Sequence, residues 1–266
     1  MKKLFLGSVA LVAFGLGAPA AFAADKRVPA YTPPPPVPVS TWSGCYLGAS
    51  AGSSSGRSTH VTTAGSTLNN PAAGVFNVPP AGANITDSFN LSGFIGGFQG
   101  GCNYQAGVWV FGVEVDGSAT NKEGQAFENA IVPPFGGVGR GAWVSQTQER
   151  WLVTARGRLG WTIWDKSMLY VTGGGAWAKI DASEFIPGGP IFSAHQESNT
   201  RGGWTVGGGL EYALGYGWSV KGEFLYVKFD NYTTFTTGPF NLGNISPREV
   251  KLEDYIWRAG MNYKLW

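Results

Sequence analysis

Beyond residue 23 the 266-residue chain lacks any run of 18 apolar residues, so the remaining sequence contains no candidate for a membrane-spanning helix. Charged residues make up only 14% of the chain, with 19 lysines and arginines against 17 acidic residues. Because this balance leaves no basic stripe, nucleic acid is excluded as an expected partner.

Motifs for catalysis and cofactor binding are also missing. The two histidines, His60 and His195, fall in long polar segments without a partner at recognisable spacing, so we expect both to be exposed and to form no metal site. Glycine strings at 136–141 and 206–210 lack a nucleotide-binding fingerprint, and no phosphate-loop Gly-Lys-Ser/Thr occurs. We therefore expect no enzymatic activity, no cofactor and no metal.

The first 23 residues have the three parts of a secretory signal peptide. Lys2 and Lys3 precede an apolar stretch at 4–16, and a small-x-small site ends at Ala23. A spanning helix is the alternative, but Gly15, Gly17 and Pro19 weaken a membrane helix and the Ala-x-Ala site favours removal. Removal of this segment leaves 17 basic and 17 acidic residues.

Residues 24–41 form a proline-rich segment, with six prolines between Pro29 and Pro38. Such a composition favours extended polyproline II, which has no internal hydrogen bonds. We expect a semi-rigid periplasmic linker; a binding role for it stays open.

The rest of the chain is rich in glycine and aromatic residues and has a period of two. At 255–265 the odd positions are apolar from Tyr255 to Leu265, while the even positions include Arg258, Asn262 and Lys264. Eleven residues with one apolar face match a strand that crosses a membrane. The same test, with weaker glycine-rich cases, gives eight strands: 42–52, 90–104, 108–119, 151–163, 168–178, 204–214, 218–226 and 255–265.

Connection lengths predict how this barrel is oriented. Short links near 105–107, 164–167 and 214–217 alternate with long polar segments near 53–89, 120–149, 179–200 and 230–250, which we interpret as loops. Outer-membrane barrels have short periplasmic turns and long extracellular loops. The sequence thus predicts an all-β, eight-stranded, antiparallel, up-and-down transmembrane barrel at 42–266 with both termini in the periplasm.

A soluble lipocalin-like barrel also alternates apolar and polar residues, but its apolar face points inward. Here aromatic residues share one parity near the strand ends, as membrane girdles do, whereas charges share the other. We predict a plugged, ion-paired lumen because eight strands leave room only for side chains, although a ring of charge lining a pore is the alternative. Its charges are Glu114, Asp116, Arg156, Arg158, Glu211, Lys221, Glu223, Arg258 and Lys264.

The only cysteines are Cys45 and Cys102. An exported chain meets an oxidising compartment, and the two residues lie at similar depth on neighbouring antiparallel strands. We therefore predict a structural disulfide over the alternative of two free thiols packed as small hydrophobes.

Several segments resemble the small alphaproteobacterial outer-membrane barrels of the RopB and surface-antigen type, related to the OmpA membrane domain and the opacity proteins. These are WSGCYLG at 42–48, GGCNYQ at 100–105, WVFGVEVD at 109–116, WSVKGEFLY at 218–226 and RAGMNYKLW at 258–266. The resemblance implies a monomeric, abundant, surface-exposed barrel. Some relatives act in envelope integrity, host interaction or haemin binding.

Two functions remain open at this point. The first is a structural, envelope-stabilising barrel whose loops serve recognition or adhesion by a host or extracellular ligand. The second is a narrow channel or a haemin-binding surface protein. In either case we expect the partners to include outer-membrane lipid, lipopolysaccharide and the barrel assembly machinery, which would read Met261, Tyr263, Leu265 and Trp266, although Trp266 departs from the apolar parity.

Overall fold

The computed structural model describes residues 41–63, 82, 84–128, 144–185, 187, 195–234 and 248–265. The predicted signal peptide, the linker before residue 41 and Trp266 lie outside the described residues. Within the described part of the chain, no helix is long and apolar enough to cross a membrane.

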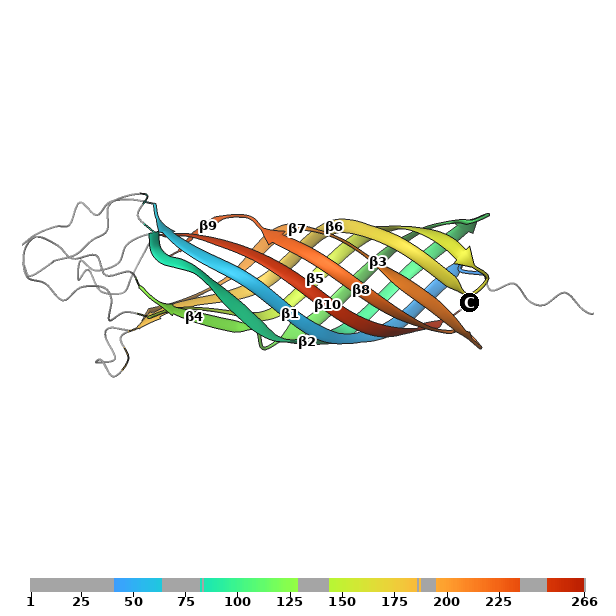
Figure 1. Cartoon of the computed structure of the whole chain (residues 1–266), viewed down its shortest axis with the longest axis horizontal. Helices are drawn as coiled ribbons and strands as arrows, with labels where there is room; N and C mark the ends of the chain where they lie inside the picture. Colours follow the sequence, from blue (N-terminus) through green and yellow to red (C-terminus); the bar gives the residue numbers. More distant parts are fainter. Residues whose placement is uncertain are drawn as a thin grey trace, which may run out of the picture. The chain divides into compact units, whose positions relative to one another are not determined.

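Antiparallel strands form one closed ring (Figure 1). The short strand β4 continues the path of β3, and β9 continues that of β8. The ten strands therefore make an eight-stranded ring, and the predicted fold class is confirmed. Pairing of β1 with both β2 and β10 closes the ring. The strands are β1 (Gly44–Thr62), β2 (Asn84–Ala106), β3 (Trp109–Thr120), β4 (Glu123–Phe127), β5 (Val144–Trp164), β6 (Ser167–Phe185), β7 (His195–Gly215), β8 (Trp218–Phe229), β9 (Tyr232–Thr234) and β10 (Arg248–Lys264).

Three two-residue turns lie at one end of the barrel, which we call the turn end. They occupy 107–108, 165–166 and 216–217. Leu265 is at the same end, because its N–H donates to the Cys45 carbonyl oxygen at 2.9 Å. The described chain therefore begins and ends at the turn end, as an even number of strands around the ring requires.

The strands run far past the limits that the sequence predicted. Segments 53–89, 120–149, 179–200 and 230–250 are predicted as loops, and this is wrong for part of each, because strand extends into all four. In these extensions the outward face is polar, so a search for a continuous apolar face ends too early.

The outward face divides the barrel into two parts. From the turn end upward it carries an apolar band on every strand, which includes nearly all the large exposed apolar side chains. We call the part of the barrel within this band the membrane section. Its last outward residues are Ala51, Phe94, Ala119, Trp151, Trp177, Trp204, Tyr226 and Tyr255.

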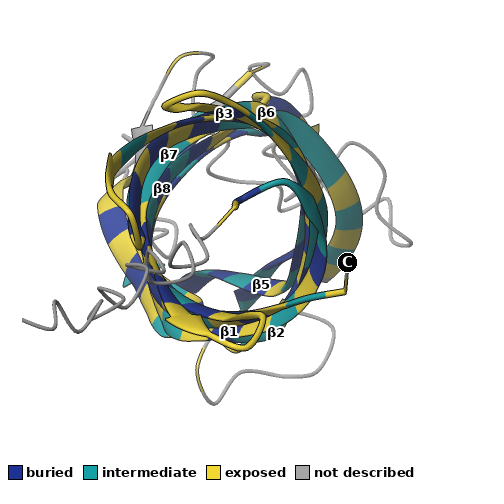
Figure 2. Ribbon diagram, turned by 90° about the vertical axis from the view of Figure 1, so that its right-hand side faces the viewer, coloured by how far each residue is buried: buried dark blue, intermediate teal, exposed yellow. Residues whose placement is uncertain are grey.

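The strand parts beyond that row form what we call the projecting section. They are 53–62, 84–93, 120–127, 144–150, 178–185, 195–203, 227–234 and 248–254. Buried and exposed residues alternate along the strands of both sections (Figure 2). The chemistry of the two faces is reversed between them, because outward residues of the projecting section are mostly polar or charged and many inward ones are apolar.

An apolar cluster fills the interior around and above the boundary between the sections. Its members come from β2, β5, β6, β8, β9 and β10, and most are at most 2% exposed. They are Phe89, Leu91, Ile95, Leu152, Ala176, Ala178, Ile180, Leu225, Val227, Phe229, Tyr232, Val250, Leu252 and Ile256. This layer, which we call the apolar core, is the larger of two buried apolar clusters; the smaller lies nearer the turn end and consists of Trp42, Val110, Met168, Tyr170 and Ala213.

Candidate functional site: the lumen charge network

Inside the membrane section, charged side chains from five strands meet in the lumen. Each has a side chain at most 4% exposed, and each lies on the inward parity of its strand. The set, which we call the lumen charge network, consists of Glu114, Asp116, Arg156, Arg158, Glu211, Lys221, Glu223 and Arg258. Four acids thus face four bases, and the network is formally neutral.

Arg156 is the centre of the network. Its Nη2 lies 2.6 Å from Glu114 Oε1 and 2.8 Å from Asp116 Oδ1, and its Nη1 lies 3.0 Å from Glu223 Oε1. The planar guanidinium presents several donors in a fixed geometry, which suits it to hold three carboxylates at once. One side chain of β5 therefore joins β3 to β8 across the lumen.

Two other bases complete the links. Arg258 contacts Asp116 at 2.9 Å and Glu223 at 2.6 Å, and Lys221 Nζ lies 2.8 Å from Glu114 Oε2. Burial of a charge is tolerated only when partners and hydrogen bonds replace water. The shared acids provide that replacement for each base.

Arg158 forms a second branch. It pairs with Glu211 and its guanidinium carbon lies 3.7 Å from the ring centroid of Tyr170. The sequence placed Glu211 opposite Lys221, and the register agrees. Nevertheless, Lys221 reaches across to Glu114.

Neutral polar side chains satisfy the remaining acceptors, and the sequence did not predict most of them. Tyr46 donates to Glu114 at 2.6 Å, Thr154 to Asp116 at 2.6 Å, and Ser219 to Glu211 at 2.5 Å. Tyr170 and Asn262, which the sequence did place inward, donate to Glu223 at 3.0 Å and to Glu211 at 2.9 Å.

Two glycines make room for the tyrosines. A Cβ on Gly101 would lie 2.8 Å from Tyr46 Cζ, and a Cβ on Gly209 would lie 2.8 Å from Tyr170 Cζ. Both contacts are too close for real atoms, so these positions require glycine unless the rings move. Glycines of β2 and β7 therefore admit large side chains of the neighbouring strands β1 and β6.

Lys264, the ninth predicted member, is not part of the network. It lies near the turn end, where its Nζ donates to the Thr41 carbonyl oxygen at 3.1 Å in an exposed position. The prediction that Lys264 shares the inward-facing positions of β10 is correct, but at the last residue of the strand its long side chain can reach the water at the rim.

Two smaller charged groups occupy the projecting section. Lys122 Nζ lies 2.6 Å from Glu149 and 2.5 Å from Asp254, and all three side chains are fully buried. Burial raises the pKa of Glu149 to about 8, with Lys122 opposing and Asp254 adding to the shift. Above them, Arg248 pairs with Glu128 at 2.9 Å and with Glu184.

A family model for the outer membrane protein beta-barrel domain matches residues 8–244. This chain belongs to the outer-membrane β-barrel family. It is 32% identical over 271 residues to the 31 kDa outer-membrane immunogenic proteins of Brucella melitensis and Brucella suis, and the match covers 99% of this chain and 100% of each relative. The resemblance drawn from the sequence is confirmed.

The chain is also similar to solved structures, at low sequence identity. Ail, the attachment invasion locus protein of Yersinia pestis, is 12% identical, with 83% of this chain and 99% of that chain covered and a TM-score of 0.37. Neisserial surface protein A is 14% identical, with 84% and 98% covered and a TM-score of 0.38.

Membership of this family assigns the protein to the outer membrane and the apolar band to the lipid. The soluble-barrel alternative is therefore wrong for the membrane section. Aromatic side chains lie at both borders of the band, as in other outer-membrane barrels. Near the turn end they include Tyr104, Trp109, Trp161, Trp218 and Tyr263, with Trp109 stacked on Trp161 and Trp218 against Tyr263.

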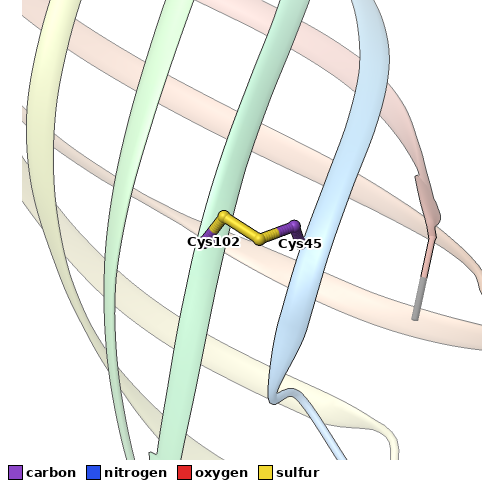
Figure 3. Close-up of a disulfide and its surroundings, with 2 residues drawn as sticks. All are labelled: Cys45 and Cys102. Carbon is purple, nitrogen blue, oxygen red and sulfur yellow. A yellow bond between two sulfur atoms is a disulfide. The ribbon is translucent and has the colours of Figure 1, made fainter.

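The predicted disulfide is present in this outer-membrane barrel. Cys45 of β1 and Cys102 of β2 are register partners and are bonded (Figure 3). Both lie on the outward parity, since their neighbours Tyr46 and Gly101 face the lumen. The bond therefore belongs to the lipid-facing wall.

The histidine prediction needs correction. His60 belongs to β1, is 1% exposed and has its Nε2 3.3 Å from Thr147 Oγ1, so it does not lie in an exposed loop. Burial, with the charge of Arg248 in the same direction, lowers the pKa of His60 to about 3. His195 begins β7, but its side chain is outside the described part of the protein.

Proposed function

We propose that this protein is a closed, non-catalytic, monomeric barrel that stabilises the outer membrane and holds its long connections beyond the membrane for recognition or adhesion. The observation that carries the proposal is the filled interior. The lumen charge network and the apolar core occupy successive levels of the same lumen.

The network links strands that are not neighbours in the ring. Arg156 of β5 contacts Glu223 of β8, and Lys221 of β8 contacts Glu114 of β3. A permeating ion would have to break such pairs, and removal of one partner from a buried pair typically costs about 3–5 kcal/mol. Above the network the lumen is filled by the apolar core and by the paired charges of Lys122, Glu149 and Asp254, which leaves an ion little polar lining in place of its water. Solute passage through this lumen is therefore disfavoured.

The orientation follows from the lengths of the connections. Short turns of outer-membrane barrels face the periplasm. With the turn end placed there, residues 41 and 265 are periplasmic, and the projecting section stands on the cell exterior. Both termini of the mature chain are then periplasmic, with the proline-rich segment as a spacer.

The projecting section explains why the barrel is longer than the membrane requires. Ten residues of β1 beyond the apolar band, tilted by about 40° at about 3.3 Å each, rise roughly 25 Å. Residues 63, 128, 185 and 234, after which the four connections start, would therefore lie above the lipid headgroups. Binding residues are commonly found on such connections when a rigid scaffold holds them.

Purified protein in planar bilayers tests whether the barrel is closed. We expect no stepwise conductance, whereas large, regular conductance steps would contradict the proposal and favour the channel alternative. Haemin titration of the same sample tests the haemin-binding alternative, for which we expect no saturable binding.

A deletion strain tests the biological role. It is complemented either with the full chain or with a variant in which residues 130–142 and 236–246 are replaced by short Gly-Ser linkers. We expect both forms to restore detergent resistance and only the full chain to restore attachment to host cells. A strain without either defect would refute the proposal.

A further inference from the structure

The residues just before β1 turn across the mouth of the barrel at the turn end. Figure 2 looks onto that end, and the segment that precedes β1 passes over the opening of the ring rather than along its wall. Trp42 is 8% exposed there and belongs to the smaller apolar cluster. The other members are the inward residues Val110, Met168, Tyr170 and Ala213. An indole from outside the sheet therefore fills the mouth of the lumen.

Hydrogen bonds from the strands on both sides of β1 hold this segment in place. On the β2 side, the Trp42 backbone N–H donates to Gln105 Oε1 at 2.8 Å. The Gln105 backbone N–H in turn donates to Ser43 Oγ at 2.9 Å. On the β10 side, Lys264 Nζ donates to the Thr41 carbonyl oxygen at 3.1 Å. The sequence motif that ends at Gln105 thus fastens the motif that begins at Trp42.

Gly44 gives the chain its bend into the mouth. It is the first residue of β1 and has a φ of 131°, which residues with a side chain rarely adopt. Residues 41–43 have no strand partner in the described part of the chain, and Trp42 Nε1 is buried there without an acceptor. A buried donor without a partner costs free energy. Few contacts and a glycine bend are what a segment that opens requires.

We propose that residues 41–43 form a strap that closes the mouth of the lumen reversibly, with Trp42 as its plug and Gly44 as its hinge. Behind the plug lies the lumen charge network, because Tyr170 of the Trp42 cluster also stacks on Arg158, at 3.7 Å from ring centroid to guanidinium carbon. The seated plug keeps water-borne molecules from these charges, and its release admits them to the lower lumen. Since the apolar core still fills the lumen above, release opens a pocket and not a channel.

A reporter thiol behind the plug tests the closure. Ala213→Cys is introduced beside the native disulfide, and the folded protein is labelled in detergent micelles with a membrane-impermeant methanethiosulfonate. Trp42→Ala in this background removes the plug. The matched control is Trp109→Ala, because Trp109 is 48% exposed on the outward face at the same end. Heat-modifiable migration shows that each variant is folded.

We expect labelling to be at least tenfold faster with Trp42→Ala and unchanged with Trp109→Ala, because access to the reporter otherwise requires local opening of the strap. With Trp42 in place, slow labelling that goes to completion reports that opening. Equal rates with and without Trp42, or no labelling at all while Trp42 is present, would overturn the proposal. Ion conductance is not the readout, so the result is separate from the test of the closed barrel.

The hinge is tested in the same reporter background. Gly44→Ala adds a Cβ that disfavours the φ of the seated strap, so we expect labelling to be several-fold faster, though slower than with Trp42→Ala. The control is Gly222→Ala, since a Cβ there would meet nothing within 4 Å, and its rate should match that of the parent. A parent-like rate for Gly44→Ala would refute the hinge.

Discussion

The membrane section and the projecting section consist of the same strands, but polar and apolar side chains are distributed differently between the two faces of the wall in each. In the membrane section the apolar side chains face outward and eight charges meet in the lumen, whereas the projecting section has apolar side chains and two smaller groups of paired charges inside and charges such as Lys228 and Lys251 outside. The period of two is unchanged across the boundary. What changes is the solvent around the wall, lipid in one case and water in the other.

The comparison shows that burial and polarity are separate quantities in this protein. The interior of both sections is closely filled, but removal of apolar surface from water contributes mainly around and above the boundary, where the larger apolar cluster lies. The membrane section has to be held together by ion pairs, hydrogen bonds and strand pairing, since its apolar surface stays in contact with lipid.

The largest expected effect is at the centre of the lumen charge network. Arg156→Met leaves Glu114, Asp116 and Glu223 without their shared base, so we expect a loss of about 3–5 kcal/mol in folding free energy. Urea titration of the folded, heat-modifiable form in vesicles measures it.

Arg150→Met is the matched control for that change. Arg150 lies on the same strand and pairs with Asp181 at 2.8 Å, but its side chain is 51% exposed. An exposed pair contributes at most about 1 kcal/mol. Similar losses for the two variants would contradict the distinction between lumen and surface pairs.

A smaller and more local effect is expected in the projecting section. Leu252 is 2% exposed within the apolar core, and Leu252→Ala should cost about 2–5 kcal/mol through lost burial and the cavity left behind. We expect faster proteolysis of the projecting section while the membrane section stays inserted. The neighbouring outward change Lys251→Ala should leave proteolysis unaltered, and sensitivity in both variants would argue against an apolar core there.

The smallest effect concerns pH. His60 has a folded-state pKa of about 3, below the ordinary value of 6.5, so it stabilises the fold fully above pH 6.5. That contribution is lost as pH falls from 6.5 towards 3, because the unfolded chain binds the proton. Hydrogen exchange around Thr59, corrected for intrinsic rates, should speed up between pH 7 and 5. His60→Gln should remove this pH dependence, and its persistence would point to another group.

Much of the membrane section could be predicted from the sequence. At 255–265 the facing of each residue follows from parity alone, and the disulfide follows from two cysteines at equal depth. The limits of the strands could not be predicted in the same way. On β10 the apolar residues change parity, from Val250 and Leu252 on even positions to Tyr255 and Trp257 on odd ones. A pattern with one fixed apolar face ends at that change.

The partners within the lumen were beyond sequence reasoning for a geometric reason. Register places Lys221 beside Glu211, but the wall of a narrow barrel curves, so a long side chain can reach a residue on a distant strand. Tyr46 and Thr154 gave no signal either, since hydroxyl groups occur on both faces of strands. Inward charges could be recognised, but their pairing depends on the closed ring.

The reversal of the two faces at the outer aromatic row also fixes the height of the protein in the membrane. A shift that drew the projecting section into the bilayer would bring Arg57, Lys179 and Lys228 into hydrocarbon, and the opposite shift would expose Trp177 and Trp204 to water. Charged residues near the bilayer midplane of such barrels cost about 2–4 kcal/mol each. The barrel therefore has a single preferred depth, independent of anything attached to its ends.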